Sequence, residues 1–185
     1  MKIIFLARDL VDRAWSAILM ELRNAVRGMD VGEFAQDDMD QRAKEKYLKE
    51  ADPNQYDDAY FMDRLMHETH HQRSDYASAL MQWLKQFRKD QILVLNYHDV
   101  SKHPRGLLKE VLSFIGTSDD IAESLGDDEI NKRFNAASDP KLRQPIRPGL
   151  RQKMETYLRP YAQDFNALLG ELGYSWRLND YSVTE

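Results

Sequence analysis

The stretch that decides the fold opens the chain, where residues 2–16 read KIIFLARDLVDRAWS. The apolar run before Arg8 is typical of a β-strand that is covered on both faces. The polar residues that follow indicate a turn and the start of a helix, for which Asp9 or Asp12 can supply the cap. The sequence therefore predicts a strand, a turn and a helix over about residues 11–27 in immediate succession.

The predicted turn brings together groups that bind an anion. The first N–H groups of a helix have no partner within the helix, and the helix dipole favours negative charge at that end. Arg8 adds a planar fork of donors that suits a phosphate, and Ser16, about one turn into the helix, can add a hydroxyl. An alternative interpretation is an ordinary strand–helix unit whose arginine pairs with a surface acid.

Two further blocks follow along the chain. Residues 74–76 precede a helical pattern in which Leu80, Trp83 and Phe87 have helical spacing, so we expect Trp83 in the core. Residues 91–95 read QILVL, and a second helical pattern from Pro104 ends in Phe114-Ile115-Gly116. The closing block contains Tyr157-Leu158, Pro160-Tyr161, Leu168-Leu169-Gly170 and Trp176. In this order the three blocks resemble the 3'-phosphate-binding segment, a later strand and the closing helices of sulfotransferases that use PAPS, the activated sulfate nucleotide.

This resemblance implies a fold of the α/β class that is rich in helices and has few parallel strands, a partial P-loop-like sulfotransferase fold. We expect a single domain over residues 1–185. Residues 30–73 form a variable acceptor-side or insertion segment within it, because the resemblance is weakest there. Proline at 148 and at 160 suits the first turn of a helix, so the end of the chain predicts two helices, at about 148–158 and 160–172.

The resemblance also implies the site residues. Arg8 and Ser16 would hold the 3'-phosphate of the donor, and Tyr76 would pack against its adenine. Lys141 and Arg143 would belong to a basic loop that folds over the nucleotide. Tyr76 can equally be a core or capping aromatic, and the basic loop can simply be solvated, since it lacks the Lys-Gly-Arg signature of the family.

The sequence departs from the family in other places. Leu10 stands where the family usually has proline, and His98 stands where an acidic residue usually precedes Asp99. The family's loop for the 5'-phosphosulfate lies upstream of the first strand. Here one residue precedes that strand, and no Gly-x-x-x-x-Gly-Lys-Ser/Thr run or similar loop appears. We therefore expect only the 3'-phosphate half of the donor site, and the catalytic residues are not identified.

The functional hypothesis is transfer of a sulfuryl group from PAPS to a hydroxyl or amine acceptor. The resemblance is nearest to carbohydrate-type members of the family, but lipid, polyketide and peptide acceptors stay open, and the sequence does not name the acceptor. Activity depends on whether the 5'-phosphosulfate site is supplied. An alternative is a non-catalytic, truncated remnant, or a nucleotide-binding or interaction domain that needs a partner chain. Two apolar strands make a thin sheet with an open edge, which indicates a homodimer, a partner chain that covers the edge, or marginal stability. The alternative is that residues 1–6 are simply the edge of the sheet, shielded by a loop.

A remote alternative comes from His67-Glu68-Thr69-His70-His71, which contains the His-Glu-x-x-His pattern of zinc hydrolases. No third ligand motif is evident, and the two inner residues are polar, unlike the usual zinc helix. A histidine of this group, or Glu68, can also serve as a general base. The interpretation that we favour is an exposed histidine cluster, and we expect no metal.

Composition limits the partners and the compartment. The 185 residues contain no cysteine and carry a formal net charge of -5, which excludes disulfides and disfavours nucleic acid or an anionic membrane as a partner. The apolar run at the start is too short for a signal peptide or a membrane span. We expect a soluble, cytoplasmic protein.

Overall fold

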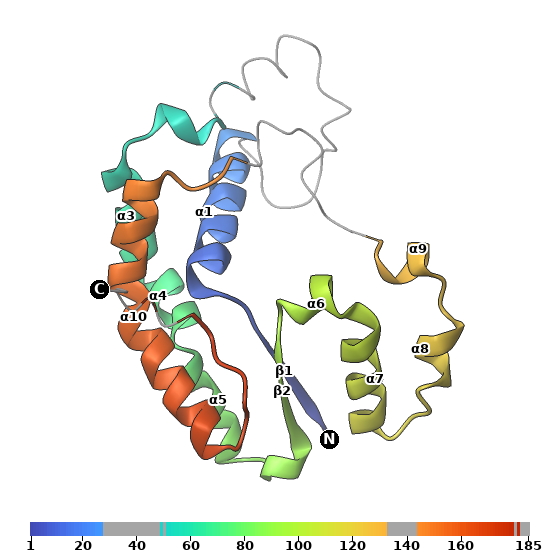
Figure 1. Ribbon diagram of the computed structural model, residues 1–185. Helices are drawn as coiled ribbons and strands as arrows, with labels where there is room; N and C mark the ends of the chain where they lie inside the picture. The colour runs from blue at the N-terminus through green and yellow to red at the C-terminus, as the bar shows by residue number, and fades with distance from the viewer. Residues whose placement is uncertain (28–48, 50, 133–143, 180, 182–185) are drawn as a thin grey trace. The chain divides into compact units, whose positions relative to one another are not determined.

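The structure is a computed structural model that describes residues 1–27, 49, 51–132, 144–179 and 181. It has the predicted α/β, helix-rich architecture (Figure 1). The elements are β1 (Ile3–Ala7), α1 (Leu10–Arg27), η2 (Pro53–Gln55), α3 (Asp58–Met66), α4 (Glu68–Ser74), α5 (Tyr76–Leu84), η3 (Lys89–Gln91), β2 (Ile92–Asn96), α6 (Asp99–Lys102), α7 (Pro104–Ile115), α8 (Asp120–Ser124), α9 (Asp127–Ile130) and α10 (Pro148–Glu171).

The chain divides into two compact units, each built from separate stretches. The strand unit comprises Met1–Leu10, Ser74–Asn135 and Leu158–Glu185, and the helical unit comprises Val11–Arg73 and Ala136–Tyr157. The single domain over residues 1–185 stays a prediction.

In the strand unit, β1 and β2 form the parallel pair that the sequence predicts. Their register runs from Ile3 opposite Ile92 to Ala7 opposite Asn96. On one face, the Phe5 ring contacts Tyr76 of α5 and Phe165 of α10, with ring centroids 5.5 and 5.9 Å apart. Figure 1 shows α7 on the other side of the strands. The strands therefore lie between helices, although Ile4 and Leu6 of β1, which alternate with Phe5, are each 44% exposed.

In the helical unit, α1 buries one face because its apolar residues recur every three or four positions. That face packs in a core that includes residues of α3 and α10: Val11, Ala14, Ile18, Leu22, Phe61, Leu65, Leu150 and Met154. Trp15 lies at the margin of this core, with its ring 5.0 Å from that of Phe61. Its indole N–H donates to the carbonyl of Gln144 at 2.9 Å, which satisfies the one polar atom of the side chain.

Two expectations about the helices are wrong. α10 is a single helix with Pro160 inside it, not two helices. Its buried residues at 150, 154, 158, 162, 165 and 169 continue through the proline with helical spacing. Each buried leucine or phenylalanine contributes about 1.5–3 kcal/mol, so the row outweighs the cost of about 3 kcal/mol for a proline within a helix.

The second correction concerns Trp83, whose helical spacing with Leu80 and Phe87 predicts a core position. Its side chain is 44% exposed. α5 ends at Leu84, one residue later, and most of the chain from 85 to 90 is itself exposed. Nothing in that stretch covers the indole, although the ring contacts Phe87 at 5.8 Å.

Across the described residues, no helix is both long enough and apolar enough to cross a membrane. The cytoplasmic location stays a prediction.

Candidate functional site

The candidate site lies where the two parallel strands end. Arg8 follows the last residue of β1, and Tyr97 follows the last residue of β2. Ala7 and Asn96, the last residues of the two strands, are partners in the register, so Arg8 and Tyr97 leave the sheet side by side. The Tyr97 N–H donates a hydrogen bond to the Ala7 carbonyl at 2.7 Å. Ligands of open α/β folds bind at this carboxyl end of the strands.

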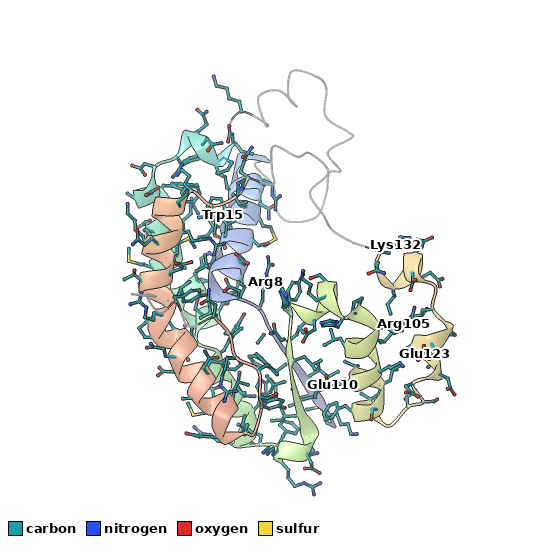
Figure 2. The ribbon with its side chains drawn as sticks, viewed as in Figure 1. Arg8, Trp15, Arg105, Glu110, Glu123 and Lys132 are labelled. Carbon is teal, nitrogen blue, oxygen red and sulfur yellow. The ribbon has the colours of Figure 1, made fainter. Side chains whose placement is uncertain are left out.

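The Arg8 side chain is held by an aromatic ring. Its guanidinium carbon lies 5.1 Å from the centroid of the Tyr97 ring, a cation–π contact, and Figure 2 shows Arg8 where β1 passes into α1. Arg8 makes no ion pair with any acid in the part of the chain that the structure describes. The interpretation in which Arg8 pairs with a surface acid is therefore not supported.

Arg105 shows what a structural arginine looks like in the same unit (Figure 2). It donates to the carbonyls of Ala122 and Leu125 and to the carboxylate of Asp127. These bonds fasten α8, the loop after it and the start of α9 to α7. The guanidinium of Arg105 thus holds parts of the fold together, whereas that of Arg8 forms no ion pair with the described residues.

The start of α1 is held by the far end of the chain. The Leu10 N–H donates to the Tyr181 hydroxyl at 3.0 Å, and this hydroxyl donates to the Asp9 carboxylate at 3.0 Å. The first amide of α1 therefore faces a tyrosine, not an anion, so the anion seat predicted there depends on Arg8. No local sequence pattern pointed to Tyr181, which is more than 170 residues away.

The tail that carries Tyr181 is itself fixed to α10. The Asn166 amide exchanges two hydrogen bonds with the backbone of Leu178, both 2.8 Å long, and the Arg159 Nε donates to the Tyr181 carbonyl at 2.8 Å. Tyr181 adopts a φ of 54°, a left-handed conformation that costs a non-glycine residue free energy. The surrounding bonds hold it there.

Comparison with known proteins identifies the family. Residues 1–158 match a family model described as "Sulfotransferase domain". This chain belongs to the sulfotransferase domain family. The resemblance read from the three sequence blocks is thereby confirmed at the level of the family, whereas the missing 5'-phosphosulfate loop stays a prediction.

The fold of this sulfotransferase domain has a relative among solved structures. The crystal structure of a sulfotransferase from Alicyclobacillus acidocaldarius matches with a TM-score of 0.50 and 18% sequence identity, over 91% of this chain and 54% of that chain. Our sulfotransferase domain thus spans about half the length of that protein. Among curated proteins, none matches this chain.

The other predicted nucleotide contacts of the sulfotransferase domain are distributed as follows. Ser16 is exposed on α1 and belongs to the helical unit, whereas Arg8 belongs to the strand unit. Tyr76 is buried, with its ring edge-on to Phe5 and 5.4 Å from Phe165, which fits the core alternative. Lys141 and Arg143 lie outside the described residues.

The sequence alone did not single out Tyr97, whose ring lies beside Arg8. A usable signal was present, because Tyr97 is the first residue after the second strand, just as Arg8 is the first after the first strand. In-register parallel strands place two such residues together. The ring is exposed, so it can meet a ligand beside the arginine.

The His-Glu-x-x-His pattern does not form the zinc site that it suggests. His67 lies between α3 and α4 with extended backbone, and His71 Nδ1 is 3.4 Å from the Tyr157 hydroxyl. Among the residues that the structure describes, no three histidine, cysteine or acidic side chains gather in a way that could hold a metal. The zinc hydrolase alternative finds no support. His70 also departs from the expected exposed cluster, since it is 2% exposed.

Proposed function

We propose that this chain binds the 3'-phosphate of PAPS through Arg8 and takes part in sulfuryl transfer to a hydroxyl or amine acceptor. The observation that carries the proposal is the arginine at the carboxyl end of β1, stacked on Tyr97 and without an ion pair among the described residues. Membership of the sulfotransferase domain family supplies the reaction class. Ser16 keeps its phosphate-binding role as a proposal from the family pattern alone.

Sulfuryl transfer requires little covalent catalysis by the protein. The sulfur–oxygen bond to the nucleotide's phosphate breaks, a bond from sulfur to the acceptor's oxygen or nitrogen forms, and the acceptor's proton passes to a base. By analogy with phosphoryl transfer, positioning and charge stabilisation supply most of the rate. Arg8 contributes to positioning, because binding energy from the remote 3'-phosphate fixes the donor.

The test is calorimetric titration with 3',5'-bisphosphoadenosine at low and moderate salt. We expect micromolar binding that weakens at least tenfold in Arg8→Ala, because a charged, bidentate phosphate contact is lost. Arg88→Ala is the matched control. Arg88 is exposed and pairs only with Asp90 among the described residues, so its loss should leave the affinity unchanged. Adenosine 5'-monophosphate, which lacks the 3'-phosphate, should bind more weakly and should not respond to Arg8→Ala.

Unchanged affinity in Arg8→Ala would remove Arg8 from the site. If the wild type binds the nucleotide, PAPS with a panel of hydroxyl and amine acceptors separates the two functional hypotheses. Sulfated product supports transfer, and binding without product supports a nucleotide-binding remnant that needs a partner chain.

A further inference from the structure

The helical unit contains a polar pocket that the donor site does not use. Its volume is about 300 Å³, at the lower end of the range for small-molecule sites. It lies where α1, α3 and α4 meet. Its walls are formed by Glu21, Asp63, Arg64, His67, Thr69 and His70.

A buried hydrogen bond fixes one wall of this pocket. His70 is 2% exposed, and its Nε2 lies 3.0 Å from Oε2 of Glu21, which is partly exposed. The histidine thus holds the glutamate carboxylate in one orientation. The other carboxylate oxygen, Oε1, has no hydrogen-bond partner among the described residues, so it can still accept a bond from a ligand.

A second wall carries Arg64, whose side chain donates no hydrogen bond to the residues that the structure describes. Arg64 stacks on the Tyr60 ring, with the guanidinium carbon 4.5 Å from the centroid, and its buried Nε has no hydrogen-bond partner. Across the described residues Arg64 makes no ion pair, although Glu21 and Asp63 line the same pocket. Buried polar groups without partners are rare in native proteins and call for a ligand or water.

The polar side chains that line the pocket determine which kind of ligand it can bind. Two carboxylates repel an anion, and an ammonium group would satisfy them but leave Arg64 without an acceptor. A hydroxyl group both donates and accepts, so several hydroxyls on one small ring can satisfy the carboxylates, Arg64 and Thr69 together. We infer that this pocket binds a neutral polyhydroxyl compound about the size of one sugar ring. That this compound is the sulfuryl acceptor rests on the proposed function, whereas its binding does not.

The first experiment compares probes of matched size by NMR titration, without nucleotide. The neutral probes are glucose, galactose, mannose and N-acetylglucosamine, and the charged probes are glucosamine and glucuronate. We expect at least one neutral sugar to bind, with shifts confined to residues that line the pocket. Preferential binding of a charged probe, or no binding by any of the four neutral sugars, would overturn the inference.

The second experiment removes one acceptor from the pocket. Asp63 is exposed, so Asp63→Asn should fold normally, and we expect the sugar affinity to fall about tenfold because a charge-assisted hydrogen bond is weakened. Asp128→Asn removes the same charge from an exposed position on α9 and should change nothing. Equal affinity in wild type and Asp63→Asn would also overturn the inference.

These results can be told apart from those on the donor site. Loss of bisphosphoadenosine binding in Arg8→Ala tests the strand unit alone, and the sugar titration tests the helical unit alone. A protein that binds sugar but not nucleotide would retain the pocket assignment and lose the proposed function. A protein that binds nucleotide but no neutral sugar would retain the proposed donor site and lose the pocket assignment.

Discussion

Among the described residues, Arg8 contacts an aromatic ring and pairs with no carboxylate, and this difference bears on the proposed phosphate binding. A cation–π contact at an exposed site contributes about 0.5–1 kcal/mol and leaves the charge uncompensated. An ion pair would have to break before a phosphate could bind. The stacking on Tyr97 therefore orients the guanidinium while its net charge stays available to an anion.

Asp58 shows the opposite arrangement, in which two cations hold one acid. Its carboxylate accepts hydrogen bonds from Lys153 at 2.9 Å and Arg147 at 2.8 Å. The bond from Lys153, and then that from Arg147, holds the pKa of Asp58 below its ordinary value. A carboxyl whose pKa is lowered in the folded protein adds stability above the ordinary pKa of about 4, and this contribution is lost as pH falls toward the folded value.

We predict that Asp58→Asn lowers the free energy of unfolding by about 1 kcal/mol at pH 7, because two partly exposed ion pairs are lost. The difference from wild type should shrink below about pH 4, where the wild-type aspartate becomes protonated. Urea unfolding at pH 7, 5 and 3.5 measures both effects.

The control for this prediction is Asp90→Asn. Asp90 also pairs with an arginine, Arg88, but both side chains are largely exposed, so solvent screens the pair and little change is expected. If the free energy of unfolding differs between Asp58→Asn and wild type by the same amount at every pH, the lost stability comes from packing and not from charge.

At the scale of single residues, the sequence predicts a role when that role depends on neighbouring residues in the chain. Arg8 was predicted because an arginine after an apolar strand is a local pattern, and its role stays a prediction. Tyr97 was missed because its role depends on pairing with a strand 90 residues earlier. The polar pocket was also missed as a unit. Its His70 was noticed for a zinc pattern, whereas the structure directs it to Glu21 on another helix.

At the scale of elements, the C-terminal tail acts as a brace for the turn that carries Arg8. The Tyr181 hydroxyl joins the first amide of α1 to the Asp9 carboxylate, and the tail is tied to α10 through Asn166 and Arg159. Asp9 and Leu10 directly follow Arg8 in the chain. The geometry of the arginine therefore depends on a residue near the other end of the sequence.

We predict that Tyr181→Phe weakens binding of 3',5'-bisphosphoadenosine and lowers the melting temperature. The ring can stay buried, but the Leu10 N–H loses its acceptor, at a cost of about 1–3 kcal/mol for a buried donor. Calorimetric titration and thermal unfolding measure the two effects. The affinity part of this prediction rests on the proposed function.

Tyr174→Phe is the matched control, because the Tyr174 hydroxyl also accepts a backbone hydrogen bond, from Val94 at 3.0 Å. It lies within the same unit and does not contact the turn at Arg8. A similar loss of melting temperature with normal nucleotide affinity is expected for Tyr174→Phe. If Tyr181→Phe behaves in the same way, the tail supports the fold but does not position Arg8.

Elements were predictable where the periodicity of one segment suffices. The sequence predicted the parallel pair β1 and β2, and it predicted α1 and α7 to within a few residues, because an apolar run and a helical stripe are local signals. It failed at Pro160 and Trp83. The preference of proline for the first turn of a helix is overridden at Pro160 by the burial of apolar side chains along α10. Trp83 is exposed because α5 ends one residue after it.

At the scale of the whole molecule, the sheet is too small to protect its own strands. In the described part of the chain β1 pairs only with β2, so its other edge has no strand beside it. Ile4 and Leu6 share one face of β1, and each is 44% exposed. An unpaired edge next to exposed apolar side chains favours association with another chain, as the sequence led us to expect.

We predict that the protein forms a dimer through β1, and that Ile4→Lys prevents it. A lysine on an edge strand opposes pairing, since its charge must lose water when a second strand approaches. Light scattering after gel filtration should show a mass that rises with concentration for wild type and stays monomeric for Ile4→Lys. Ile121→Lys changes an equally exposed isoleucine on α8 and should still dimerise. A wild type that stays monomeric at every concentration would mean that β1 is protected within a single chain. Dimerisation that persists in Ile4→Lys would move the interface away from this strand.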